Sequence, residues 1–193
     1  MRAPRKEHLI QTAVELFRRR GYHATGIDRI IAEAGVAKMT LYKHFRSKDD
    51  LIVAALRRWD EDSRRWLIRA IEERADEPYE RLLALFDVLD EWFDTPEYGG
   101  CMFINAAAEY PDPTDPIHRA AAEHKRLFRE YLQEQVAACG FEDPDVVTGQ
   151  LLLLMEGAIV TAQVSRQVGP GEVPLARRAA EVLLSQASRK LSA

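Results

Sequence analysis

Cysteine is scarce in this chain, and long apolar runs are missing. Only Cys101 and Cys139 occur among 193 residues, with no CxxC pair and no histidines at metal-ligand spacing beside them. This pattern predicts no disulfide framework and no metal site, and it favours a reducing, cytoplasmic location. The basic start MRAPRKE continues into an amphipathic segment, which argues against a signal peptide. The longest apolar stretch, LLLLMEGAIV, is interrupted by Glu156 and too short to span a bilayer, so we expect no membrane partner.

The sequence also lacks clear strands and common enzyme motifs. Its strongly periodic segments have apolar residues at helical spacing, which predicts an all-α fold of about nine helices. A helical enzyme is one alternative, because Cys101, Glu109, His118 and His124 lie near one another in the sequence and could supply a nucleophile and a base. No known motif surrounds them and no Gly-rich phosphate loop is present, so we expect neither catalysis nor a cofactor.

Charge is unevenly distributed along the chain. The net charge of -4 would by itself argue against a nucleic-acid partner. Residues 1–50, however, hold 11 of the 27 Lys and Arg residues but only 6 of the 31 Asp and Glu residues. A basic head on an acidic body is typical of a DNA-reading module joined to a regulatory one.

Three helices are predicted within the first fifty residues. The first ends near Gly21, the second runs from about Gly26 to a sharp turn at Gly35, and the third runs from Lys38 to Phe45. Two short helices joined by a tight Gly-containing turn have the proportions of a helix-turn-helix. The alternative is an ordinary small helical bundle with a solvated polar face.

Capping patterns mark several helix starts. Thr25-Gly-Ile-Asp28 and Ser47-Lys-Asp-Asp50 have the spacing of capping boxes, and Asp115-Pro116 and Asp143-Pro144 each place an N-cap acid before an N1 proline. Beyond residue 47 we expect helices over residues 48 to about 76, 79–93, 102–109, 116–138, 144–167 and 174–190.

One stretch of the sequence carries a family resemblance. Residues 10–56, IQTAVELFRRRGYHATGIDRIIAEAGVAKMTLYKHFRSKDDLIVAAL, resemble the DNA-binding region of TetR-family regulators almost without gaps, including AGV, TLYKHFRSK and the following D-L. The remainder matches only in length and helix count. The resemblance implies a helix-turn-helix domain over residues 1–47 and a ligand-binding and dimerisation domain over residues 48–193. It also implies a regulator, most often a repressor, that binds a palindromic operator as a homodimer and is released by a small-molecule inducer.

The resemblance assigns roles to residues of the head. Leu41 and Phe45, four residues apart, should face inward. Asp28 departs from the family pattern, which often has a basic residue there, and its carboxylate would repel a phosphate. The bases would be read by Lys38, Met39, Thr40 and Lys43, and phosphates would be held by Thr25, Tyr42, His44 and Lys48.

The last two predicted helices are the expected dimer contact, as the resemblance implies. Apolar and small residues at helical spacing support this interpretation, although both helices could instead be intramolecular core. The residues concerned are Leu152, Met155, Gly157, Ala158, Ile159 and Ala162 on one helix and Ala176, Ala179, Ala180, Leu183, Leu184 and Ala187 on the other. A dimer would read two half-sites about one helical turn apart.

The effector pocket should combine aromatic walls with isolated polar residues, which suggests an apolar or aromatic small molecule. Glu156 could bind a cationic inducer or pair with an arginine across the dimer. Two other regulators stay open: a thiol-redox sensor that uses Cys101 or Cys139, and one whose body binds a protein. The candidate walls are Trp59, Trp66, Phe86, Trp92, Phe93, Met102, Phe103 and Phe128, and the candidate anchors are Asn105, Glu109, His124, Glu156 and Gln163.

Overall fold

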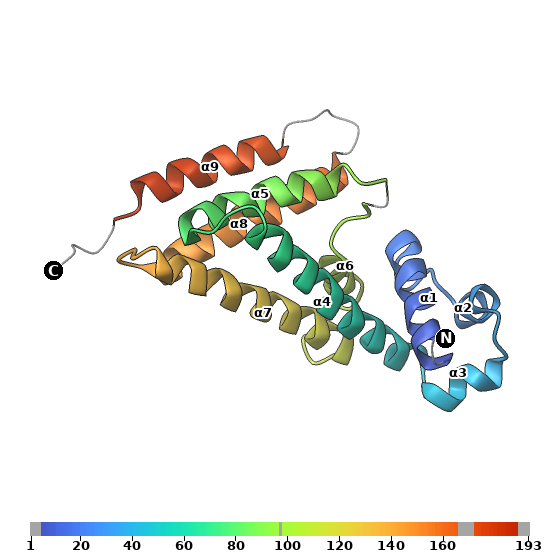
Figure 1. Ribbon diagram of the computed structural model, residues 1–193. Coiled ribbons are helices and arrows are strands. Elements are labelled where there is room, and N and C mark those ends of the chain that lie inside the picture. The colour runs from blue at the N-terminus through green and yellow to red at the C-terminus, as the bar shows by residue number, and fades with distance from the viewer. Residues whose placement is uncertain (1–4, 97, 166–171, 189–193) are drawn as a thin grey trace. The chain divides into compact units, whose positions relative to one another are not determined.

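The computed structural model describes residues 5–96, 98–165 and 172–188, and their regular elements are nine α-helices (Figure 1). The predicted all-α fold is therefore confirmed. The helices are α1 (Arg5–Arg20), α2 (Ile27–Ala34), α3 (Lys38–His44), α4 (Lys48–Glu72), α5 (Pro78–Phe93), α6 (Met102–Glu109), α7 (Pro116–Ala138), α8 (Pro144–Val164) and α9 (Glu172–Gln186).

The chain forms two compact units. The first contains the residues up to Ser63 together with Cys101–Lys125, and the second contains Arg64–Gly100 together with the residues from Arg126 on. Helices α1 to α3 and α6 belong to the first unit, whereas α5, α8 and α9 belong to the second. Helices α4 and α7 contribute residues to both, so the units do not divide where the domain boundary was predicted, between residues 47 and 48. That domain assignment stays a prediction.

Helices α1, α2 and α3 pack against one another around a small apolar core. Leu9, Ile30 and Leu41, one from each helix, are fully buried in it. Gly35 ends α2 in the left-handed conformation at φ 62°, and its N–H donates to carbonyls of the last turn. Because side chains disfavour this conformation, glycine makes the tight turn into α3 possible. The predicted helix-turn-helix geometry is present.

Side-chain caps form at three of the four predicted helix starts. Ser47 Oγ accepts from the Asp50 N–H at 3.0 Å, Asp115 Oδ1 accepts from the Ile117 N–H, and Asp143 accepts from the Val146 N–H. The capping box predicted at Thr25 was wrong. Thr25 is buried and its hydroxyl donates to the preceding Gly21 carbonyl at 2.7 Å, while Gly26 is the N-cap of α2 and makes no side-chain hydrogen bond.

Several predicted helix ends extended too far. Helix α4 ends at Glu72 rather than near residue 76, α8 ends at Val164, and α9 ends at Gln186. The predicted ends at residues 167 and 190 fall within 166–171 and 189–193, which lie outside the described residues.

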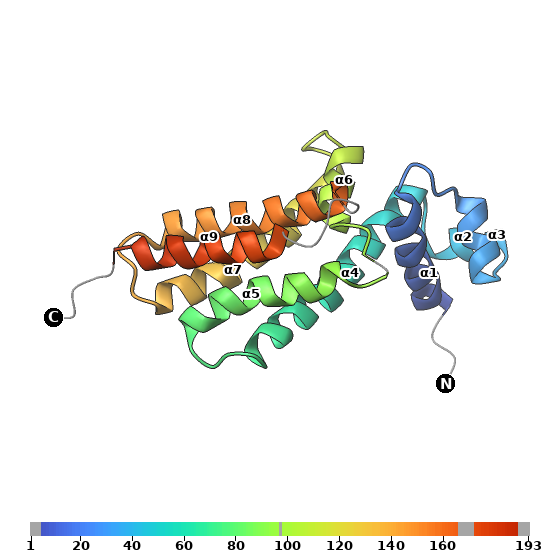
Figure 2. The same cartoon turned by 90° about the horizontal axis from the view of Figure 1, so that it is seen from above.

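In the second unit, α9 packs against both α5 and α8, and α8 and α9 run side by side in opposite directions (Figures 1 and 2). Met155, Ala158 and Ile159 of α8 are buried within this unit. They are therefore core residues, and the prediction that they lie on an exposed dimer face was wrong, because the side of α8 that is turned outward carries other residues.

Helix α8 is the one described helix that is long and apolar enough to cross a bilayer by length and composition. The core helix of a soluble protein passes the same test. Its 21 residues exceed the apolar stretch considered in the sequence, because the helix continues on both sides of that stretch.

Candidate nucleic-acid interface

The outward side of α3 is the candidate interface. Leu41 is fully buried and Phe45 is 5% exposed, as predicted, so these two side chains fix α3 to the core. On the other side Met39 is 80% exposed and Tyr42 is 45% exposed. Lys38 and Lys43 are also exposed, whereas Thr40 and His44 are half-buried. A short helix therefore presents cationic, aromatic and thioether groups outward, and their contacts to bases and phosphates stay predictions.

Lys38 has a partner on the neighbouring helix. Its Nζ lies 3.1 Å from Oδ1 of Asp28, in the first turn of α2, and the two side chains are 60% and 85% exposed. The hydrogen bond to Asp28 and the charge of that carboxylate raise the pKa of Lys38, so the ammonium is retained at neutral pH.

Thr25 and Lys48 differ in their access to a phosphate. The buried Thr25 hydroxyl is directed to the Gly21 carbonyl, so a phosphate contact by this residue requires its backbone or that of the following turn. Lys48 is half-buried, and its Nζ donates to the His23 carbonyl at 3.4 Å. Its ammonium retains further donors, since a lysine carries three.

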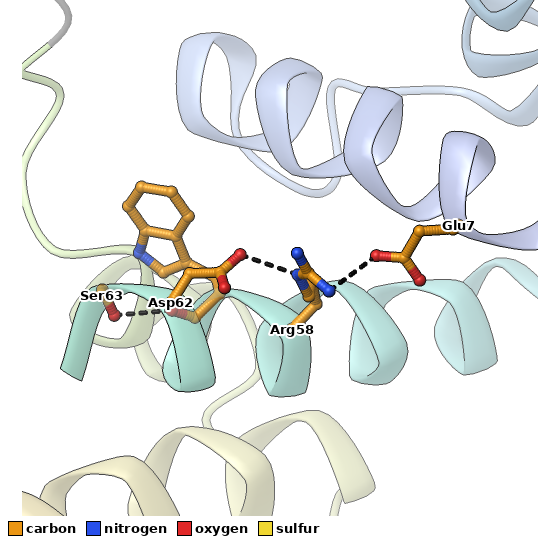
Figure 3. Close-up of polar contacts among 5 residues, drawn as sticks. Glu7, Arg58, Asp62 and Ser63 are labelled. Atoms are coloured by element: carbon orange, nitrogen blue, oxygen red, sulfur yellow. Dashed lines mark hydrogen bonds and ion pairs between the residues drawn. The ribbon is translucent and has the colours of Figure 1, made fainter. Parts of the chain in front are cut away.

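Helix α1 is joined to α4 by charged and aromatic contacts. Arg58 lies between Glu7 of α1 and Asp62 of its own helix, at 2.9 and 2.7 Å (Figure 3). The guanidinium of Arg18 lies over the Trp59 ring, 4.5 Å from its centroid. Trp59, a candidate pocket wall, therefore contacts α1 within the first unit.

The end of α6 is bonded to the turn between α1 and α2. The Glu109 carboxylate accepts from the N–H groups of Tyr22 and His23 at 2.9 and 2.6 Å. The His23 Nε2 lies 3.0 Å from the Glu109 carbonyl oxygen, and its ring stacks on Tyr110. Gly21 precedes these amides at φ 79°, and a Cβ there would lie 2.8 Å from Glu109 Oε1. The glycine thus permits the close approach of the carboxylate.

Tyr22 forms a second link to α6. Its side chain is buried, and its hydroxyl donates to the Met102 carbonyl at 2.9 Å. Burial, followed by the charges of Cys101, Glu109 and Tyr110, raises the pKa of Tyr22 well above its usual value. No local sequence pattern indicates the role of Tyr22, because its partners are some eighty positions away.

The candidate pocket residues of the first unit already have partners. Glu109 holds the α1–α2 turn, Met102 receives the Tyr22 hydroxyl, and the His124 Nδ1 lies 2.7 Å from Asp60 Oδ1. The His124 ring stacks in parallel on Phe103, with 3.6 Å between centroids. Asn105 is half-buried on α6. Their role toward an effector stays a prediction, while their structural contacts are evident.

The remaining candidates lie in the second unit. Trp92 and Phe93 surround Tyr98, which the sequence analysis did not single out; this tyrosine is buried and donates to the Ile159 carbonyl at 2.7 Å. Gln163 packs against Gly100, where a Cβ would collide with the amide. Of the others, Phe86 and Phe128 are buried, Glu156 is half-buried and Trp66 is exposed.

A surface groove of about 590 Å³ also lies in the second unit, and none of the predicted pocket residues lines it. Arg177 of α9 contributes to it and pairs with Asp87 of α5 at 2.8 Å. Within the described part of the chain, no three His, Cys, Asp or Glu side chains gather as a metal site would require. The groove is lined by Arg74, Ala75, Asp76, Glu77, Glu80, Leu83, Ala84, Asp87 and Arg177.

Comparison with known proteins connects this geometry to a family. The profile of bacterial regulatory proteins of the tetR family matches residues 9–55, and that of the tetracyclin repressor-like C-terminal domain matches residues 78–179. The HTH-type transcriptional regulator YjdC of Escherichia coli (strain K12) is 26% identical over 179 residues, 93% of each chain. The HTH-type transcriptional repressor DhaR of Mycobacterium sp. (strain GP1) is also 26% identical, over 88% of this chain and 87% of its own.

A solved structure agrees with these sequence matches. SCO4454, a TetR-family transcriptional regulator from Streptomyces coelicolor, superposes with a TM-score of 0.86 and 32% identity, covering 96% of this chain and 90% of its own. The profile match to the C-terminal domain alone spans more than half of the chain. This chain therefore belongs to the TetR family of transcriptional regulators.

Proposed function

We propose that this chain is a cytoplasmic repressor that binds a palindromic operator as a homodimer and releases it when a small molecule binds. The outward side of α3 carries this proposal. Because Leu41 and Phe45 are buried in the core of the head, α3 is held in place with Lys38, Met39 and Lys43 directed outward. The major groove of B-DNA admits one α-helix, and these side chains match its acceptors and thymine methyl groups.

The outer surface of α8 and α9 supports dimerisation. Val146, Leu153 and Val160 follow one another at intervals of seven on α8 and are 52%, 75% and 41% exposed. Leu175 and Val182 show the same interval on α9 and are 69% and 57% exposed. Single exposed apolar residues are ordinary, but rows of them on two adjacent antiparallel helices indicate a protein interface. We call this set the α8–α9 stripe.

Two glycines make the α8–α9 stripe suitable for close packing. A Cβ built at Gly149 or Gly157 of α8 would meet nothing within 4 Å, so the space beside both is open. A second copy related by a twofold axis would place the same two helices against this surface. Such a dimer carries two α3 helices, as a palindrome requires.

The contacts of α6 support a route for regulation. An effector that displaces α6 would also displace the turn between α1 and α2. The Glu109 carboxylate is bonded to the Tyr22 and His23 amides, and the Met102 carbonyl is bonded to the Tyr22 hydroxyl. The effector must bind more tightly to the arrangement that does not fit DNA, since only differential affinity can shift the equilibrium. The aromatic candidates in both units favour an apolar or aromatic effector.

Selection of bound duplexes from a random DNA pool tests the proposal. We expect a palindromic consensus, which then serves as the probe in a screen for small molecules that release it. A non-palindromic consensus would contradict the dimeric operator reader. Failure to enrich any sequence in the presence or absence of extracted small molecules would contradict operator binding itself. The relatives are regulators, and we propose neither catalysis nor a cofactor for this chain.

One contact favours a second candidate, a thiol-redox response. Lys125 Nζ lies 3.7 Å from the sulfur of the buried Cys101, and a cation beside the sulfur is typical of reactive cysteines. Release of the selected operator by hydrogen peroxide, reversed by a thiol and absent in Cys101→Ser, would favour this candidate. Operator binding that is unchanged by peroxide would remove it.

A further inference from the structure

The Asp28–Lys38 pair is exposed at the start of both helices of the helix-turn-helix. Asp28 belongs to the first turn of α2 and Lys38 is the first residue of α3, and these two helices pack against each other (Figure 1). The 3.1 Å contact places an ammonium and a carboxylate side by side on the surface. The other outward residues of α3, Met39, Tyr42 and Lys43, carry no carboxylate, and Asp28 places one beside Lys38.

Stability of the fold does not account for the pair. An exposed ion pair contributes little to folding because water screens both charges. Neither residue caps a helix: the N-caps of α2 and α3 are Gly26 and Ala37, and neither N-cap makes a side-chain hydrogen bond. A carboxylate on a surface that approaches phosphates also opposes binding, unless the DNA offers it a hydrogen-bond donor.

A G·C base pair offers the complementary groups. In the major groove guanine presents the acceptors N7 and O6, and cytosine presents the N4 amino donor. O6 and N4 are hydrogen-bonded to each other and so lie about 2.9 Å apart, close to the separation of the Lys38 Nζ and the Asp28 Oδ1. Lys38 has two donors left for O6 and N7, and the Asp28 carboxylate keeps acceptor lone pairs, on Oδ1 as well as Oδ2, for N4.

An A·T pair presents the reverse arrangement to the same two side chains. The adenine N6 amino group stands where guanine has O6, and the thymine O4 stands where cytosine has N4. The ammonium would then face a donor and the carboxylate an acceptor. The pair thus discriminates at both of its ends.

We propose that Asp28 and Lys38 act together as a reader of one G·C base pair in each operator half-site, with Lys38 on guanine and Asp28 on cytosine. This inference rests on the proposed function and adds the base class that the head selects. It assigns Asp28 a recognition role, where the sequence alone suggested only repulsion of a phosphate.

The test compares duplex selection by the wild-type protein and by Asp28→Asn, Lys38→Ala and Glu33→Gln. The last is a matched control, because Glu33 forms an exposed ion pair with Arg29 on the same helix, at 3.2 Å. We expect a G·C position in each half-site of the wild-type consensus. Competition between the operator and its A·T-substituted form at that position should show about a tenfold loss of preference in Asp28→Asn and in Lys38→Ala. Glu33→Gln should retain the wild-type preference.

Coupling between the two residues sharpens the test. If the pair reads as a unit, the double variant loses no more preference than either single variant. Tighter binding of Asp28→Asn to all duplexes, with an unchanged G·C preference, would overturn the inference and leave the carboxylate as a repulsive group only. A wild-type palindrome with no G·C position that depends on Lys38 would overturn it as well. Enrichment of no sequence by the wild-type protein would instead remove the proposed function, and this inference with it.

Discussion

The outward side of α3 and the α8–α9 stripe are both exposed helix surfaces backed by a buried core, but their chemistry differs. Lys38, Tyr42 and Lys43 on α3 are well solvated in the absence of a partner and attract phosphates when one is present. Leu153, Val160 and Leu175 are apolar, and their contact with water is unfavourable. Covering them with another apolar surface lowers the free energy of association. This contrast agrees with the two partners proposed above, DNA at one surface and a second copy of the chain at the other.

Changing the α8–α9 stripe should have the largest effect. Leu153→Glu places a charge in the middle of the row, so we expect monomers by analytical ultracentrifugation. Because two linked half-site contacts bind far more tightly than one, operator affinity should fall about 100-fold or more. Ala137→Glu, which adds the same charge to an exposed alanine of α7, is the control and should remain dimeric. A dimeric Leu153→Glu protein would show that the stripe is not the interface.

Glu109 should stabilise the unit that carries the DNA-reading surface, because its carboxylate binds the turn between α1 and α2. Glu109→Gln replaces one acceptor by an amide that faces a backbone N–H, so the free energy of unfolding should fall by about 2 kcal/mol. Urea titration followed by circular dichroism measures the change. Glu130→Gln is the control, because Glu130 forms an exposed ion pair with Arg126 of its own helix, α7. This variant should change stability far less. Equal stability of the two variants would exclude a supporting role for Glu109.

Changing the α3 side should leave dimerisation intact. Lys48→Ala removes a predicted phosphate contact, so binding should weaken about tenfold on all sequences and the salt slope should fall by about 1. Fluorescence anisotropy over a series of salt concentrations gives both quantities. Arg69→Ala, an exposed cation of the second unit, should match the wild-type protein. An unchanged slope in Lys48→Ala would refute the phosphate contact.

A smaller effect is expected at Tyr131 of α7, in the second unit. Burial, together with the charge of Glu72 and against that of Arg81, raises the pKa of Tyr131 from 10.0 to about 12. The unfolded chain therefore loses this proton first, and the associated stability is complete below pH 10 and disappears as the pH rises to about 12. Tyr131→Phe should lack this part of the alkaline destabilisation.

At neutral pH the same variant should be no less stable than the wild-type protein, because the buried Tyr131 hydroxyl has no hydrogen-bond partner among the described residues. Tyr98→Phe is the matched control. Its hydroxyl donates to the Ile159 carbonyl, so its removal should lower the free energy of unfolding by about 1 kcal/mol. Thermal unfolding at neutral and alkaline pH compares the two. Greater loss in Tyr131→Phe than in Tyr98→Phe would contradict this description.

Local signals in the sequence predicted much of the fold. Asp115-Pro116 and Asp143-Pro144 located the starts of α7 and α8, because an N-cap acid and an N1 proline act within a few residues of chain. Leu41 and Phe45 likewise revealed the buried side of α3 through their spacing. The capping box at Thr25 failed because Gly26 is the N-cap of α2, and the buried Thr25 hydroxyl donates to the Gly21 carbonyl instead of accepting from an N–H of the first turn.

Long-range contacts could not be predicted in the same way. Glu109 has the sequence features of an isolated polar anchor, and nothing near it indicates the amides of Tyr22 and His23, some 86 positions away. On α8 the sequence showed an apolar helix without a clear polar side. Periodicity therefore did not distinguish the buried Met155 from the exposed Leu153.

The mass of the complex between this protein and its selected operator tests the central claim most directly. Analytical ultracentrifugation of the protein with the full palindrome should give two chains on one duplex, and a duplex with one half-site should bind far more weakly at the same salt concentration. A single chain bound to the full palindrome with the same affinity as to the half-site would contradict the account, because neither the α8–α9 stripe nor the paired α3 helices would then contribute to recognition.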